Sequence, residues 1–261
     1  MLHGYWLRTL GIDGAYEFAD VAPEKFEAFF RGLKRNGYAG GNITIPHKEA
    51  AFRLVDRRER AADAIGAVNT VWYEGEMLIG GNTDWYGIVA SLDDIHPGWD
   101  APGGRVVVLG AGGSARASVF AFLERKFSVA LVNRTRERAE KLAAQFGPQV
   151  AVHDWSEVPA LLAGADVLIN NTSLGMAGKP PLAIDLDPLK SSAIVYDVVY
   201  VPLETALLKA AKARGHRTVD GLSMLLYQAV NGFSHWFGVT PKVTAEQRRI
   251  LEDDILAKTG G

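Results

Sequence analysis

Hydrophobic and polar positions along the chain follow two periods, one typical of helices and one typical of strands. Residues 23–36 repeat apolar side chains at helical spacing, with Pro23 in the first turn and Gly37 as the stop signal. Residues 68–73 and 77–82 are strand-like runs separated by a turn through glutamate and glycine. Helices that alternate with strands in this way predict an α/β fold.

The middle of the chain predicts a second structural unit. Residues 85–95 have helical periodicity, and residues 96–104, rich in glycine and proline, break it. We interpret this break as a boundary between two domains. Beyond it, residues 105–110 form an apolar run typical of a strand buried on both faces of a parallel sheet. A helix follows to about Arg125, and residues 128–133 predict the next strand.

Three short segments place small polar side chains where apolar runs end. Residues 42–48 (N-I-T-I-P-H-K) run as a strand into a proline that can open a helix, a junction that can hold Thr44 and Lys48 against a small molecule. Residues 66–70 (G-A-V-N-T) and 81–84 (G-N-T-D) use the same residue types. These segments are the candidates for a small-molecule site.

Composition and charge exclude several classes of function. A formal net charge of -2 over 261 residues gives no general attraction to nucleic acid or to anionic membranes. The densest charge run, residues 53–60, mixes both signs and is interpreted as a solvated helix face. With no cysteine, no apolar run of membrane length and no paired histidine spacing, the sequence predicts no disulfide, no membrane span and no metal site. We therefore expect a soluble cytoplasmic protein.

A glycine-rich turn joins the first strand of the second predicted unit to the helix behind it. Gly110 permits a tight turn, Gly112 lets the backbone approach a pyrophosphate, and the small Ala115 lets the helix pack on the strand. Backbone amides at the helix start, around Gly113 and Ser114, are suited to hold phosphates. Because the turn lies between a predicted strand and a predicted helix, we expect dinucleotide binding.

The end of the second predicted strand bears on the choice of cofactor. An NAD enzyme usually places Asp or Glu there to bind the ribose hydroxyls, whereas this chain has Asn133 followed by Arg134 and Thr135. Arg134 presents a planar fork of donors that suits a 2′-phosphate, and Arg138 adds a second positive charge. Alternatively, Arg134 is a surface residue before a helix that Thr135 caps. The missing acid and the second arginine favour NADP.

Six motifs, taken in order, resemble those of the shikimate dehydrogenase family. They are residues 42–48, 66–70, 81–84, 170–176, 197–205 and 221–229. The resemblance implies an α/β chain of two domains, a substrate-binding domain at 1–86 plus 222–261 and an inserted Rossmann-type NADP-binding domain at 87–221. It further implies the reversible reduction of 3-dehydroshikimate to shikimate by NADPH, in aromatic amino acid biosynthesis.

The resemblance implies that Lys48 and Asp84 form the catalytic pair. A carboxylate and an ammonium that meet in a cleft can orient a hydroxyl and move its proton while hydride leaves the same carbon. By residue type alone, Lys48 is an exposed lysine in a first helical turn and Asp84 is the N-cap of the helix behind it. The family resemblance favours the catalytic interpretation of both.

Substrate-binding residues are also implied by the resemblance, and each has a plainer interpretation. Thr44 and Asn69 bind ring hydroxyls in the family, but strand-end polar groups also bond to nearby backbone. Gln228 is a substrate donor or a solvent-facing helix residue, and Tyr200 contacts the substrate carboxylate end or packs a loop. The expected cofactor-binding residues are Gly110, Gly112, Gly113, Ser114, Ala115, Asn133, Arg134, Thr135, Arg138, Thr172, Gly221 and Met224.

The amino terminus departs from the family pattern. The family begins with a strand and a Ser-x-Ser-Pro segment whose serines hold the substrate carboxylate, whereas this chain opens at residues 1–6, which resemble the helix after that segment. Either the sequence starts late relative to the natural protein or another group replaces the serines, and we expect the first.

Three functions compete at this point. The leading one is an NADP-dependent shikimate dehydrogenase, the second is a relative that acts on quinate or an amino analogue with NAD or NADP, and the third is a nucleotide-sensing relative without catalysis. The expected partners are a small-molecule substrate and the dinucleotide, and the chain is expected to be a monomer or a homodimer.

Overall fold

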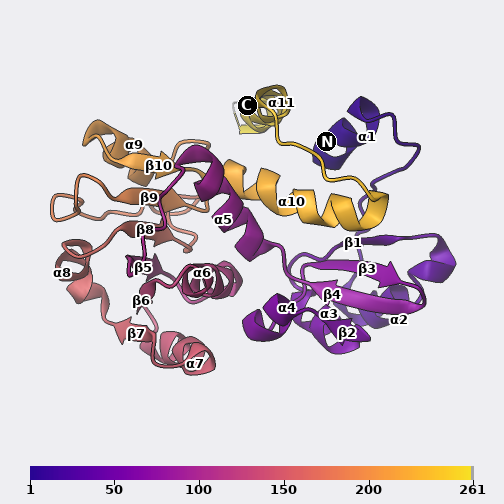
Figure 1. Cartoon of the computed structure of the whole chain (residues 1–261), viewed down its shortest axis with the longest axis horizontal. Helices are drawn as coiled ribbons and strands as arrows, with labels where there is room; N and C mark the ends of the chain where they lie inside the picture. The colour runs from indigo at the N-terminus through magenta and orange to yellow at the C-terminus, as the bar shows by residue number, and fades with distance from the viewer. Residues whose placement is uncertain (260–261) are drawn as a thin grey trace. The chain divides into compact units, whose positions relative to one another are not determined.

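The computed structural model describes residues 1–259, which divide into two compact units (Figure 1). The first unit contains Met1–Asp84 and Leu226–Leu251. The second contains Trp85–Leu225 with the helical residues from Glu252 on. The chain therefore leaves the first unit at the start of one helix and returns to it inside another, as an insertion requires.

The loop at residues 96–104 lies inside the second unit, so our placement of the domain boundary there was wrong. The helix before it, α5 (Asp84–Ile95), already packs in the second unit. Trp85 of this helix contacts Phe120 edge to face, with the ring centroids 5.3 Å apart. A break in periodicity marked the end of this helix and not the end of a domain.

A four-stranded sheet with the order β1-β3-β4-β2 forms the centre of the first unit. β3 and β4 pair as an antiparallel hairpin, and Gly75 in its turn has a φ of 63°, which suits glycine. Both strands were predicted within two residues of their ends. The elements are α1 (Leu2–Thr9), η1 (Pro23–Lys25), α2 (Phe26–Arg31), η2 (Lys34–Asn36), β1 (Gly40–Asn42), α3 (Lys48–Leu54), β2 (Arg57–Arg58), α4 (Arg60–Ile65), β3 (Thr70–Glu74) and β4 (Met77–Gly81).

The single helix predicted over residues 23–36 is broken into three pieces. The amides of Gly32 and Leu33 bond three residues back, so the α-helix tightens and ends where glycine has little helix propensity. Gly37, at a φ of 85°, is the stop that was predicted. Phe26 and Phe30 of α2 are buried in the core of this unit.

Residues 42–48 also differ from the prediction of a strand that leads straight into a helix. β1 ends at Asn42, and a turn closed by the His47 amide on the Thr44 carbonyl, 2.9 Å apart, follows it. The Ile45–Pro46 peptide bond in this turn is cis, and Ile45 is 83% exposed. The helix begins at Lys48 and not at the proline, because the turn comes first.

The charge run at residues 53–60 is not one helix face, as we had interpreted it. The Asp56 amide bonds to the Leu78 carbonyl at 2.9 Å, and the Leu78 amide bonds to Asp56 Oδ2 at 2.7 Å. These bonds bring β2 alongside the free edge of β4 as a parallel neighbour. An available strand edge thus overrode the local preference for helix.

The second unit contains a parallel sheet of six strands in the order β10-β9-β8-β5-β6-β7. Counted along the chain, this is the 3-2-1-4-5-6 order of the doubly wound dinucleotide-binding fold, with its switch point between β5 and β8. Its elements, together with the carboxy-terminal helices, are α5, β5 (Arg105–Leu109), α6 (Gly113–Glu124), β6 (Ser128–Val132), α7 (Arg136–Phe146), β7 (Val150–His153), η3 (Trp155–Glu157), α8 (Val158–Leu162), β8 (Val167–Asn170), β9 (Ile194–Asp197), α9 (Ala206–Ala213), β10 (Arg217–Val219), α10 (Gly221–Phe237) and α11 (Ala245–Thr259).

Helices cover both faces of this parallel sheet (Figure 1). Apolar residues of α8 and α9 form one core with inward residues of β5, β6, β8 and β9, while α6 and α7 lie along the other face. β5 is buried along Val106–Leu109, as its apolar run predicted. The α/β fold class is confirmed. Across the described residues, every helix is too short or too polar to span a bilayer.

A buried carboxylate joins the carboxyl ends of β8 and β9. Asp197, 0% exposed, accepts hydrogen bonds from Thr205 Oγ1 at 2.7 Å, Asn170 Nδ2 at 2.9 Å and the Val199 amide at 3.1 Å. Asn170 Oδ1 in turn accepts from the hydroxyl of Thr172 at 2.7 Å. The carboxylate therefore holds together the two loops that leave the sheet beside its switch point.

Burial raises the pKa of Asp197 from 3.8 to about 6, despite these three donors. A raised pKa means that folding disfavours the ionised form of Asp197. The residue therefore contributes most to the free energy of unfolding at pH values below its unfolded pKa, where it is protonated in both states. We expect wild type to lose about 2 kcal/mol relative to Asp197→Asn as pH rises from about 4 to about 7. Urea unfolding of both proteins at the two pH values measures this change. The exposed Asp187→Asn is the control and should show no such change; an equal change in both variants would contradict the assignment.

Candidate active site

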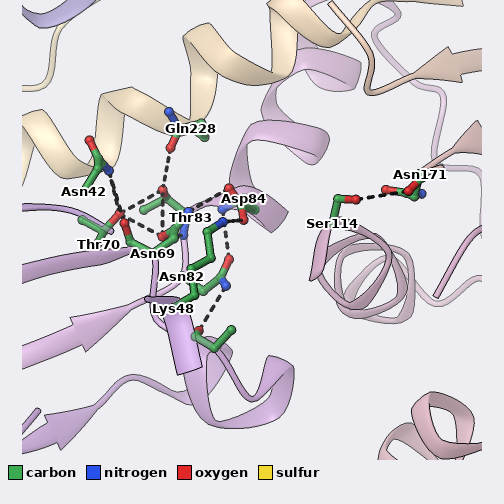
Figure 2. A network of polar contacts seen from close by, with 11 residues as sticks. Asn42, Lys48, Asn69, Thr70, Asn82, Thr83, Asp84, Ser114, Asn171 and Gln228 are labelled. Carbon is green, nitrogen blue, oxygen red and sulfur yellow. Dashed lines mark hydrogen bonds and ion pairs between the residues drawn. The ribbon is translucent and has the colours of Figure 1, made fainter. Parts of the chain in front are cut away.

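Three polar side chains of the first unit meet at the ends of its elements. Lys48 is the first residue of α3, Asn69 directly precedes β3, and Asp84 is the first residue of α5. Lys48 Nζ lies 2.6 Å from Asp84 Oδ2, and Asn69 Nδ2 donates to Asp84 Oδ1 at 2.8 Å (Figure 2). The lysine and aspartate side chains are 25% and 14% exposed, so the pair is sheltered yet reachable from solvent.

Backbone bonds fix Asn69 between two strand ends. Its carbonyl accepts from the Ile43 amide at 2.7 Å, and its amide donates to the Gly81 carbonyl at 3.0 Å. Asn82 Oδ1 accepts from the backbone amide of Asp84 at 3.1 Å, so Asn82 takes the capping role that residue type alone assigned to Asp84. The carboxylate of Asp84 is thereby left to face Lys48 and Asn69.

The other predicted substrate residues are placed differently from this pair. Gln228 Oε1 accepts from Thr83 Oγ1 at 3.1 Å, which joins α10 to the same network. Thr44 is exposed and lines a cavity of about 400 Å³ together with Asn42. That lining does not include Lys48 or Asp84. Tyr200, 39% exposed, follows β9 and belongs to the second unit.

Five residues of this network were missed as candidates from the sequence. Asn42, Asn82 and Thr83 lie inside motifs that were singled out, so their positions were available although no role was assigned to them. Thr70 directly follows Asn69 and is fully buried, which only the folded chain reveals. Tyr16 donates to Asn42 Oδ1 at 2.7 Å across 26 residues of sequence, and no local signal marks it.

The glycine-rich turn of the second unit has the geometry of a phosphate site. Gly110 has a φ of 105°, and a Cβ there would lie 3.0 Å from the carbonyl group of Asn171, so only glycine fits. At Gly112 and Gly113 a Cβ would meet nothing within 4 Å, so the start of α6 is open. Ala115 behind it is buried against the sheet. The open helix start with its free amides fits a dinucleotide pyrophosphate.

Two unpaired cations follow β6. Arg134 and Arg138 are exposed, and within the described part of the chain neither side chain contacts a carboxylate. Arg136, between them, is bound instead to Glu140 at 2.9 Å and to Asp154 at 2.8 Å. Asn133 Nδ2 donates to the Thr135 carbonyl, and the Thr135 side chain makes no capping bond to α7. The structure thus leaves two guanidinium groups available to an anion where an NAD enzyme usually has an acid.

The remaining predicted cofactor residues follow neighbouring strands or open α10. Ser114 Oγ and the Asn171 carbonyl are 3.5 Å apart (Figure 2), and Thr172 directly follows Asn171 after β8. Gly221 opens α10 so close to β9 that a Cβ would lie 2.2 Å from the Val198 carbonyl oxygen. Met224, one turn later, is half-buried. Among residues 1–259, no three His, Asp or Glu side chains gather as metal ligands would.

Comparison with known proteins identifies the family. Residues 1–71 match the shikimate dehydrogenase substrate binding domain, and residues 96–176 match the shikimate/quinate 5-dehydrogenase family. A shikimate dehydrogenase (NADP+) of Mesorhizobium japonicum is 55% identical over 258 residues, which is 98% of this chain and 92% of that protein. The chain belongs to the shikimate dehydrogenase family. The resemblance seen in the six sequence motifs is therefore confirmed.

Solved structures of the shikimate dehydrogenase family extend the comparison to the fold. Shikimate 5-dehydrogenase of Thermus thermophilus, crystallised with NADP(H) and shikimate, matches with a TM-score of 0.85 at 32% identity, over 98% of this chain and 93% of that one. Quinate dehydrogenase of Corynebacterium glutamicum, crystallised with NAD, matches with a TM-score of 0.87 at 30% identity, over 97% of this chain and 93% of that one. Relatives named for shikimate and for quinate thus share this fold, so the overall fold does not decide between these two substrates.

Proposed function

We propose that this chain is an NADP-dependent shikimate dehydrogenase, which interconverts 3-dehydroshikimate and shikimate in aromatic amino acid biosynthesis. The observation that carries the proposal is the Lys48–Asp84 pair, held by Asn69, in a chain 55% identical to an enzyme of that name. The sheltered pair presents a proton donor and acceptor beside hydrogen-bonding groups, which is the chemistry that interconversion of an alcohol and a ketone needs.

In this proposal, Lys48 transfers the proton of the reaction. In the direction of oxidation, the neutral amine of Lys48 takes the proton of the substrate hydroxyl, and in reduction the ammonium returns it to the carbonyl oxygen. Asp84 orients the lysine through its 2.6 Å contact, and Asn69 holds the other carboxylate oxygen. Bound NADP supplies the site that accepts or gives the hydride.

The two units divide the binding work in this proposal. The first unit binds the substrate, with Thr44, Asn69 and Gln228 on its hydroxyls. Tyr200 keeps the role that the family resemblance implies for it, a contact with the carboxylate end of the substrate. The second unit binds NADP through the open start of α6 and through Arg134 and Arg138. We place the enzyme in the cytoplasm, as a monomer or a homodimer.

A steady-state assay with shikimate and quinate, each against NADP and NAD, tests the proposed function. We expect kcat/KM to be highest for shikimate with NADP, by about tenfold or more over each other combination, or about 1.4 kcal/mol. Preference for quinate with NAD would replace the proposal with the second family activity. Nucleotide binding without turnover on any of the four combinations would favour a sensing role.

Removal of the Lys48 amine should act on the chemical step. Lys48→Ala should lower kcat by roughly 10²–10⁴-fold while KM for NADP stays near its wild-type value, because the amine moves a proton and does not touch the cofactor in this scheme. Asp84→Asn should behave similarly, since it removes the charge that orients the lysine. Lys34→Ala, which breaks an exposed pair with Glu76, is the matched control and should leave kcat unchanged. Turnover above a third of wild type in Lys48→Ala would remove the lysine from the mechanism.

Cofactor preference should depend on the free arginines after β6. Arg134→Ala should raise KM for NADP about tenfold or more and leave the weak activity with NAD almost unchanged, because the 2′-phosphate loses a charged donor. Arg136→Ala is the matched control, since its guanidinium is already bound by Glu140 and Asp154. The loss in Arg134→Ala should also shrink at high salt. Equal losses of activity with NADP and with NAD would show that Arg134 does not bind the 2′-phosphate.

A further inference from the structure

A continuous hydrogen-bond chain connects Tyr16 to the Lys48–Asp84 pair within the first unit. The Tyr16 hydroxyl donates to Asn42 Oδ1 at 2.7 Å, and Asn42 Nδ2 donates to Thr70 Oγ1 at 3.1 Å. The Thr70 hydroxyl donates to Asn69 Oδ1 at 2.9 Å, and Asn69 Nδ2 donates to Asp84 Oδ1 at 2.8 Å (Figure 2). These residues come from four segments of the sequence, around Tyr16, at residues 42–48, at residues 69–70 and at Asp84, so this hydrogen-bond chain exists only in the folded protein.

The direction of each bond near Thr70 follows from its partners. The Asn42 amide nitrogen can only donate, so the Thr70 oxygen accepts from it and the Thr70 proton is left for Asn69 Oδ1, 2.9 Å away. Thr70 is 0% exposed, so water does not replace a lost partner there. Thr83 Oγ1, 3.2 Å from Thr70, donates to Gln228 at 3.1 Å.

The orientation of the Asn69 amide is fixed by the same contacts. Its Oδ1 accepts from the Thr70 hydroxyl and from the Thr83 backbone amide at 2.8 Å, and a backbone amide can only donate. The Asn69 amide nitrogen must then face Asp84 Oδ1. Asp84 consequently carries one donor on each oxygen, Asn69 on Oδ1 and Lys48 on Oδ2. A carboxylate held at both oxygens cannot rotate away from the lysine.

We infer that Thr70 is a positioning residue for the proposed proton transfer, acting through Asn69 on the Lys48–Asp84 pair. This inference rests on the proposed function. Loss of the Thr70 hydroxyl loosens the Asn69 amide, frees Asp84 Oδ1 to turn, and weakens the contact between Asp84 and the ammonium of Lys48. The ammonium of Lys48 is then held less firmly, and the amine is less well placed to take a proton from the substrate.

Tyr16 and His3, the titratable groups at the far end of this hydrogen-bond chain, are neutral near neutral pH, so their titration does not contribute to the pH profile there. Burial raises the pKa of Tyr16 to about 12 and lowers the pKa of His3, which lies against it, to about 4. Asp84 and Lys48 are the charged members of the network. A change in the pH profile of a Thr70 variant is therefore a change at that pair.

The test compares Thr70→Val, which removes the hydroxyl at similar shape, with Thr70→Ser, which keeps it. We expect Thr70→Val to lower kcat about tenfold, to move the midpoint of the pH profile of kcat down by about half a pH unit or more, and to leave KM for NADP unchanged. Thr70→Ser should restore both values. Tyr16→Phe, at the far end of the chain, should give a smaller change in the same direction.

A buried hydroxyl elsewhere supplies the control for stability. Ser91 is 0% exposed and its hydroxyl contacts Tyr196 at 2.7 Å, so Ser91→Ala should destabilise the fold without moving the pH profile. Thermal unfolding of all variants then separates stability from positioning. A wild-type pH profile in folded Thr70→Val, or a profile that Thr70→Ser does not restore, would overturn the inference.

A second measurement needs no turnover and keeps the two proposals apart. Acetic anhydride acylates only the neutral amine, so Lys48 acylation at neutral pH, followed by peptide mass spectrometry, reports the strength of the contact with Asp84. We expect acylation in Thr70→Val to be about threefold faster than in wild type and Thr70→Ser to match wild type. Inactivity of wild type on shikimate with this acylation pattern would reject the function and keep the positioning role; equal acylation rates would reject the positioning role.

Discussion

The amide oxygen of Asn69 is the constraint on which the geometry of the first unit's polar site depends. It accepts from the Thr70 hydroxyl and the Thr83 backbone amide, and the amide nitrogen therefore faces Asp84 and donates to it. Because Asn69 is 3% exposed, a flipped amide would leave buried donors facing each other without an acceptor. One side-chain orientation therefore decides where the carboxylate sits and, through it, where Lys48 sits.

Close backbone approach plays the corresponding role in the second unit. Gly110 and Gly221 lie where a Cβ would meet the backbone of the segments after β8 and β9, so these turns pass over the carboxyl edge of the sheet without side chains of their own. The edge beside the switch point is thereby left to the amides of α6. A dinucleotide site of this kind needs little side-chain chemistry, because the backbone supplies the donors.

Two aspartates illustrate how the surroundings separate structural from chemical roles. Asp197 is fully buried, its pKa is raised to about 6 by that burial, and it accepts hydrogen bonds from a hydroxyl, a side-chain amide and a backbone amide, all of them neutral. Asp84 is 14% exposed at its side chain and lies 2.6 Å from an ammonium. Residue type is the same in both cases. Because of their different burial and partners, Asp197 connects two loops, whereas Asp84 is suited to orient the lysine that moves a proton.

The sequence by itself determined the features that depend on neighbours along the chain. The parallel strand at residues 105–109 and the tight turn at Gly110 follow from a local apolar run and from steric limits on φ, so both were predicted correctly. The absence of an acid after β6 is also a local feature, and the role of the arginines there stays a prediction. The α/β class and the family followed from these runs and from six ordered motifs. The placement of β2 and the ends of the segment at residues 42–48 could not be predicted from the sequence, because an available strand edge and a turn competed with local propensity.

Only the tertiary structure decided which polar groups meet. Tyr16, Asn42 and Thr70 carry no local signal of their partnership, since their hydrogen bonds cross 26 and 28 residues of sequence. Gln228 joins Thr83 across 145 residues. Hydrogen-bond geometry is set by positions in space to within tenths of an ångström, and sequence spacing fixes such positions only within one helix or strand.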